Sequence, residues 1–101
     1  MKPFPSGLTA YKQTLEFTQK TVPAGLLHAH RTKEGVWGKL IVLDGSITYR
    51  ILEPEREEWV LTAGQYGVIE PTVLHEVVPH DGVRFFVEFH RAADTPQHPE
   101  P

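Results

Sequence analysis

The sequence predicts a single all-β domain built from short strands. Apolar and polar residues alternate over short stretches, and an apolar repeat with the helical period is nearly absent. Turn signals such as Asp44-Gly45 and Asp81-Gly82 separate these stretches at intervals of about 8–12 residues. This spacing is typical of a β-barrel or a β-sandwich.

About eight strands are expected, each bounded by glycine, proline or charged turns. They span residues 13–17, 24–30, 36–43, 46–52, 58–62, 66–70, 73–78 and 84–90. The stretch 46–52 alternates most regularly and places Ile47, Tyr49 and Ile51 on one face. The turn at 81–82 is interpreted as a hairpin that joins the last two strands.

The length of 101 residues suits one domain and leaves no room for a second. Residues 1–7 contain two prolines and a glycine and are expected to form an extended lead-in. Residues 8–90 form the predicted domain, and the proline-rich stretch 91–101 is expected to be a disordered tail. The core of so short a chain is modest, so a partner subunit would help to bury apolar surface.

Composition argues against several classes of function. The net charge is −3 and the basic residues are scattered, so a nucleic-acid-binding surface is not expected. The chain has no cysteine, which removes disulfides and thiolate chemistry. Without a long apolar run or a secretory signal, we expect a cytoplasmic protein that does not enter a membrane. Motifs of nucleotide-binding proteins and α/β-hydrolases are absent.

Histidines and one glutamate are candidates for a metal site. His28 and His30 would share a face, because side chains alternate along a strand. If the predicted hairpin centres on 81–82, His75 lies opposite Glu88, with Cβ atoms about 5 Å apart. Histidines together with a carboxylate suit Fe(II), Mn(II), Ni(II) or Zn(II).

These candidates also have purely structural interpretations. A single histidine on a strand is more often structural than a metal ligand. If Phe85, Val87 and Phe89 form the core face of their strand, Glu88 faces solvent instead. A register slip of one residue would also separate Glu88 from His75.

The chain contains several distinctive short motifs: His-x-His at 28–30, Gly-Val-Trp-Gly-Lys-Leu at 35–40, Leu-Asp-Gly at 43–45, Gly-Gln-Tyr-Gly-Val-Ile-Glu-Pro at 64–71, His75, and Phe-Val-Glu-Phe at 86–89. Together they resemble those of the small cupin-like family named after TehB and YeaR, within the cupin superfamily. The likeness extends from about Leu8 to Phe89, which is nearly the whole predicted domain.

The resemblance implies a cupin-type β-barrel (a double-stranded β-helix, or jelly roll), often dimeric, with a metal site at one mouth. His30 and His75 match positions typical of the family's metal site, and Glu88 matches an acidic position in its last strand. His28 matches the first histidine of the general cupin motif. Gly38 stands where general cupins carry a glutamate, so the usual ligand set is not intact.

Three functions therefore remain open. The first is a metal-binding protein that holds a divalent ion (Zn, Fe, Mn or Ni) on His30, His75 and Glu88, with His28 as an optional fourth ligand. A small molecule or anion would bind at the metal, in a homodimer associated with tellurite or nitrite stress, as the resemblance implies. The second is a non-enzymatic binding or sensing module that uses the same pocket. The third is a structural barrel, in which the ring nitrogens of His30 and His75 lie more than about 6 Å apart.

Overall fold

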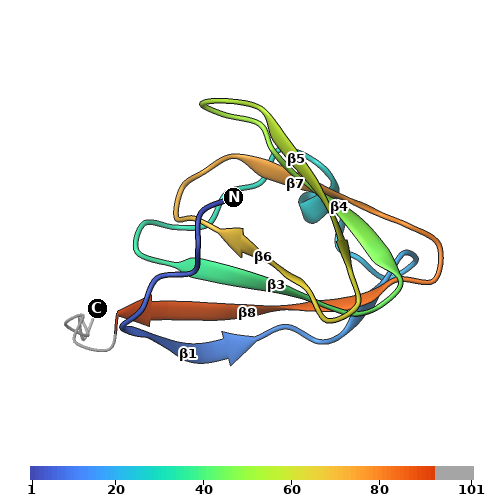
Figure 1. Cartoon of the computed structure of the whole chain (residues 1–101), viewed down its shortest axis with the longest axis horizontal. Helices are drawn as coiled ribbons and strands as arrows, with labels where there is room; N and C mark the ends of the chain where they lie inside the picture. Colours follow the sequence, from blue (N-terminus) through green and yellow to red (C-terminus); the bar gives the residue numbers. More distant parts are fainter. Residues whose placement is uncertain (93–101) are drawn as a thin grey trace.

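Two antiparallel sheets face each other and contribute side chains to one apolar core (Figure 1). The structure is a computed structural model and describes residues 1–92. The five-stranded sheet contains β1 (Leu8–Gln13), β2 (Phe17–Thr18), β3 (Trp37–Asp44), β6 (Tyr66–Ile69) and β8 (Arg84–Ala92). The three-stranded sheet contains β4 (Ser46–Ile51), β5 (Glu57–Thr62) and β7 (His75–Pro79). A short 3-10 helix, η1 (Ala24–Leu27), precedes β3.

The strand order is β1-β8-β3-β6 in the larger sheet, where β2 also pairs with β8, and β5-β4-β7 in the smaller sheet. The all-β prediction is therefore confirmed. Hydrogen bonding within residues 1–92 forms two sheets and does not close them into a continuous barrel.

The strands predicted from residue 36 onward match β3 to β8 within one or two residues at nearly every end. In β4, Ile47, Tyr49 and Ile51 are all buried on the core side, as their shared face suggested. The Tyr49 hydroxyl donates a hydrogen bond to the Val68 carbonyl at 3.0 Å, and its ring stacks on Trp59.

The two earliest predicted strands were wrong. The range 13–17 spans the end of β1 and the first residue of β2, with a break between them. The range 24–30 contains η1, and only His30 within it makes a β-bridge. Pro23 is the N-cap of this helix, and the Leu26 amide donates to the Pro23 carbonyl at 3.0 Å. A short apolar run does not distinguish a strand from a helical turn, which explains the error.

The predicted hairpin between the last two strands was also wrong. β7 pairs with β4 in the smaller sheet, where His75 lies opposite Ile51. β8 pairs with β3 and β1 in the larger sheet, where Glu88 lies opposite Lys39. The turn at 81–82 thus carries the chain from one sheet to the other, and the predicted pairing of His75 with Glu88 does not occur.

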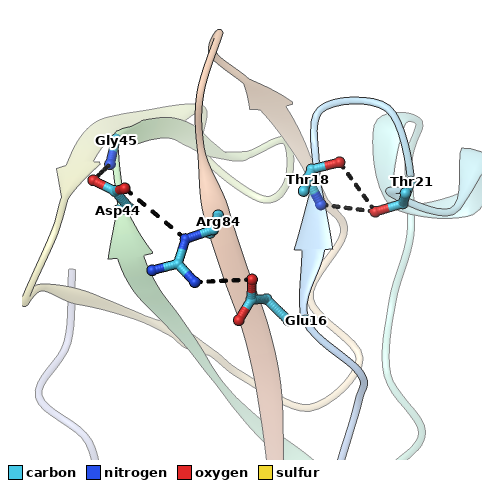
Figure 2. A network of polar contacts seen from close by, with 6 residues as sticks. All are labelled: Glu16, Thr18, Thr21, Asp44, Gly45 and Arg84. Carbon is cyan, nitrogen blue, oxygen red and sulfur yellow. Dashed lines mark hydrogen bonds and ion pairs between the residues drawn. The ribbon is translucent and has the colours of Figure 1, made fainter.

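Polar contacts join Glu16, just before β2, and the end of β3 to β8 (Figure 2). Arg84 on β8 contacts Glu16 at 3.1 Å and Asp44 at 3.9 Å. In the turn that follows β2, the Thr18 amide donates to the Thr21 hydroxyl at 2.8 Å. These contacts lie along the chain that leads toward η1 and His30.

The ends of the described chain differ from the expectation in detail. Phe4 in the lead-in packs its ring against Trp37 and His90. β8 continues through Ala92, two residues beyond the predicted strand, and the rest of the predicted tail, 93–101, lies outside the described residues. In the part of the chain that the structure describes, no helix has the length and apolar character needed to cross a membrane.

Candidate functional site

His30 and His75 lie side by side at the edge of the three-stranded sheet. The His30 amide donates to the His75 carbonyl at 2.7 Å, and the His75 amide donates to the His30 carbonyl at 2.8 Å. Their ring centroids are 5.3 Å apart, with the ring planes nearly perpendicular. The structure therefore brings these two predicted site residues together through a β-bridge between a loop and β7.

The surroundings of His75 determine the tautomer and the protonation state of its ring. Only 1% of the residue is exposed, and Nδ1 lies 3.1 Å from the Val73 carbonyl. Because a carbonyl can only accept, Nδ1 carries the hydrogen and Nε2 keeps its lone pair. Burial lowers the pKa of His75 below the usual 6.5; the Val73 hydrogen bond opposes this shift, and the neighbouring His30 adds to it. His75 is therefore neutral at pH 7.

His30 has a buried ring nitrogen without a partner. Within residues 1–92, its Nδ1 makes no hydrogen bond and is shielded from solvent. A buried polar atom left in this state is unfavourable by about 1–3 kcal/mol. It gains a hydrogen bond if a water molecule, an ion or a ligand group reaches it, or if the ring turns toward another group.

A cavity of about 230 Å³ adjoins the histidine pair. Its lining comes from both sheets and from the η1 segment: Thr14, Phe17, Pro23, Gly25, Leu26, His30, Thr32, Ile69, His75, Val87 and Phe89. Most of these side chains are apolar, and the two imidazoles are the titratable groups among them. An apolar cavity with a few polar groups is typical of small-molecule sites, and this one is smaller than the ~300–1,000 Å³ of drug-sized pockets.

The other two predicted ligands lie elsewhere. His28 is exposed just after η1 and does not line the cavity. In β8, Phe85 and Val87 are buried toward the core, so Glu88 points to the opposite face of the sheet. There its carboxylate lies 2.7 Å from Nε2 of His90. The structure thus does not bring Glu88 or His28 to the histidine pair.

Gly38, at the place of the usual cupin glutamate, has little room for a side chain. It lies on β3 opposite Ile69 of β6. A Cβ atom added at Gly38 would lie 3.1 Å from the Ile69 Cβ, which is tighter than ordinary contact. Ile69 itself lines the cavity. An apolar side chain therefore occupies the neighbourhood in which the glutamate would be expected.

The histidine pair fits part of a metal site. Imidazoles bound to one ion through bonds of about 2 Å would have centroids about 5 Å apart, close to the observed 5.3 Å. However, the described residues contain no group of three or more His, Cys, Asp or Glu side chains arranged to hold a metal. Protein zinc sites use at least three protein ligands. His30 and His75 could therefore fill two positions, and other groups would have to fill the rest.

Sequence reasoning missed the part of the site that follows His30. Thr32 is nearly buried, and its hydroxyl donates to the Val36 carbonyl at 2.8 Å. Its own carbonyl accepts from the Thr72 amide at 3.1 Å. Thr32 thereby fixes the loop between His30 and β3. A threonine in a charged loop carries no sequence signal for this burial.

Comparison with known proteins places the chain in a family. The model of the TehB-like domain matches residues 12–87. The chain belongs to the TehB-like domain family. This confirms the TehB-like part of the resemblance seen in the sequence.

Solved structures resemble this TehB-like chain over most of its length. A crystal structure of a protein from E. coli (strain K12) matches with a TM-score of 0.83 and 25% identity, covering 93% of this chain and 100% of that one. The crystal structure of TehB from Haemophilus influenzae matches with a TM-score of 0.79 and 28% identity, covering 86% of this chain and 32% of that one. This chain therefore spans about a third of that TehB chain. No curated protein matches its sequence significantly.

Proposed function

We propose that this TehB-like chain is a small-molecule-binding module with a cupin-type jelly-roll architecture. Its ligand occupies the cavity between the sheets and contacts His30 and His75. The observation that carries the proposal is the cavity itself, an apolar space whose lining includes two adjacent imidazoles. The two facing sheets support the jelly-roll assignment.

The states of the two rings indicate what kind of ligand fits. Nε2 of His75 is an acceptor without a hydrogen, so it suits a hydroxyl or amine donor. Nδ1 of His30 lacks a partner among residues 1–92 and is shielded from solvent, so a ligand atom reaches it only if the ring turns toward the cavity. The remaining lining is apolar, and the volume is small. The ligand is therefore compact and mostly apolar, with a polar group directed at the histidines.

The uncharged probe benzyl alcohol tests this proposal by NMR titration of the amide resonances. Binding in the cavity shifts the resonances of His75 and Phe89 in a saturable manner. Leu26→Trp fills the cavity and abolishes these shifts, whereas Val60→Trp, on the exposed face of β5, adds the same ring elsewhere and leaves them unchanged. Shifts that do not saturate, or that persist unchanged in Leu26→Trp, would refute the proposal.

Metal binding is a second candidate for the same site. It is favoured by the hydrogen bond from Nδ1 of His75 to Val73, because ligating histidines commonly donate their other ring nitrogen in this way. A divalent ion (Zn, Fe, Mn or Ni) would bind to His30 and His75, with the small molecule and water in the open positions. Such an ion would supply a Lewis acid or a redox centre.

Elemental analysis of protein purified without added metal tests this second candidate. The metal content should be near one equivalent and should be lost in His75→Ala. His28→Ala is the matched control, because His28 is exposed and outside the cavity. A content below about one-tenth equivalent of any transition metal, unchanged by His75→Ala, would exclude metal binding as a function of this site.

The physiological setting of the module is proposed from the family resemblance alone. A role as a binding or sensing component in tellurite or nitrite stress responses would suit a domain that also forms part of TehB. The homodimer and the cytoplasmic location expected from the sequence stay predictions.

A further inference from the structure

A second, more open pocket adjoins the cavity at His30. We call it the basic groove and define it by Lys12, Arg31 and Lys33, together with His30, Thr32 and Phe89. The last three residues also line the cavity, so they form a wall shared by the two spaces. Lys12 reaches the groove from β1, where it lies opposite Phe89 of β8.

The groove concentrates positive charge on a chain whose net charge is −3. Lys12, Arg31 and Lys33 line it, and no carboxylate does. None of these three cations lies within 4.0 Å of a carboxylate belonging to residues 1–92. Glu34 follows directly in the sequence but is not part of the lining. A concave surface lined by one sign of charge attracts ions of the opposite sign.

The shared wall joins this positive surface to the apolar cavity. Phe89 offers an apolar surface to both spaces. His30 also lines both, and its ring centroid lies 5.3 Å from that of His75. We propose that the ligand of the cavity is a small organic anion. Its negative group lies among Lys12, Arg31 and Lys33, and the rest of the molecule extends past Phe89 into the cavity, where its polar group faces the histidines. This inference rests on the proposed function and adds the ligand's charge to it.

Benzoate and benzyl alcohol form a matched pair of probes for this inference, because they share the phenyl ring and differ in charge. In NMR titrations of the full chain at low salt, benzoate should bind at least about fivefold more tightly than benzyl alcohol. Both should shift the resonances of His75 and Phe89. Raising NaCl from about 50 to about 500 mM should weaken benzoate binding and leave benzyl alcohol binding unchanged.

Charge-removing variants identify the cations responsible. The double variant Arg31→Gln with Lys33→Gln should weaken benzoate binding about fivefold and leave benzyl alcohol binding unchanged. Arg56→Gln is the control, since Arg56 is an exposed cation outside both pockets. The amide spectrum of each variant without probe reports whether its fold is intact.

Each possible outcome supports or overturns the anion preference. Equal affinity for the two probes, or an equal effect of Arg56→Gln, overturns it and leaves the cavity as a binding site for neutral molecules. Benzoate shifts confined to Arg31 and Lys33 also overturn it, because the anion would then not enter the cavity. Failure of both probes to bind overturns the proposed function together with this inference.

Discussion

His30 and His75 exchange two backbone hydrogen bonds, although one lies in a loop and the other in β7. The two amides donate at 2.7 and 2.8 Å, and the ring centroids lie 5.3 Å apart. Backbone pairing of this kind fixes the two Cα positions without help from a ligand. The histidine pair is therefore held in place before anything binds, which lowers the cost of ordering the site.

The buried state of His75 should make stability depend on pH. Its pKa is lowered in the folded chain, so the unfolded chain takes up the proton first as the pH falls below about 6.5. The free energy of unfolding should then decrease from about pH 7 toward pH 5. Urea denaturation across this range should show a shallower decrease in His75→Gln than in the native sequence. Parallel slopes for His75→Gln and the native sequence would contradict this reading of His75.

The hydroxyl of Tyr49 should contribute measurably to stability. It is buried and donates to the Val68 carbonyl at 3.0 Å, so Tyr49→Phe leaves that acceptor without this donor. We expect a loss of about 1–2 kcal/mol in the free energy of unfolding, measured by chemical denaturation. Tyr11→Phe removes a hydroxyl from a residue that is 40% exposed and should change stability by less than about 0.5 kcal/mol. Similar losses in both variants would argue against the role assigned to this hydrogen bond.

Two glycines with positive φ should tolerate alanine to different degrees. Gly45 has φ +70°, and an added Cβ would lie 2.9 Å from the Val83 Cα. Gly64 has φ +87°, but an added Cβ would meet open space. Gly64→Ala should cost about 1 kcal/mol from backbone strain alone, and Gly45→Ala should cost about 2–3 kcal/mol because the steric conflict is added. Thermal or urea unfolding measures both, and an equal effect would mean that the Gly45 turn relaxes freely.

The ion pairs of Arg84 should contribute little to the free energy of unfolding. Arg84 contacts Glu16 and Asp44 (Figure 2), but about half of its side chain is exposed. Exposed ion pairs are worth roughly 0–1 kcal/mol. Arg84→Met should therefore change the free energy of unfolding by less than about 1 kcal/mol at moderate salt. A larger loss that disappears at high salt would show that this network is more strongly coupled than its exposure suggests.

Much of the fold was predictable because local alternation reflects burial. The face formed by Ile47, Tyr49 and Ile51 is the clearest case, since all three residues are buried in the structure. The connection at 81–82 was not predictable in this way. A glycine turn between two strands looks the same whether it closes a hairpin or carries the chain between sheets, and here it does the latter. Pairing partners are a property of the whole fold.

The candidate site could also be predicted only in part, because it depends on which strands pair. His30 and His75 were candidates from their strand positions and then from the family resemblance, and the structure places their rings together. The predicted role of Glu88 as a ligand beside His75 depended on the predicted hairpin. Its actual position depends on which face of β8 is buried. Burial of Phe85 and Val87 placed Glu88 on the other face of β8. The basic groove went unnoticed because Lys12 and Arg31 are far apart in the sequence and converge only in the fold.

The central claim is that a ligand contacts the histidine pair inside the cavity. It is tested most directly by the imidazole ¹H–¹⁵N spectrum of the full chain, recorded with and without benzyl alcohol. Without the probe, His75 should show hydrogen on Nδ1 and none on Nε2. With saturating probe, the Nε2 resonance of His75 should shift, and Leu26→Trp should remove the shift. A His75 ring with its hydrogen on Nε2, or one whose resonances do not shift when the probe is added, would contradict the account.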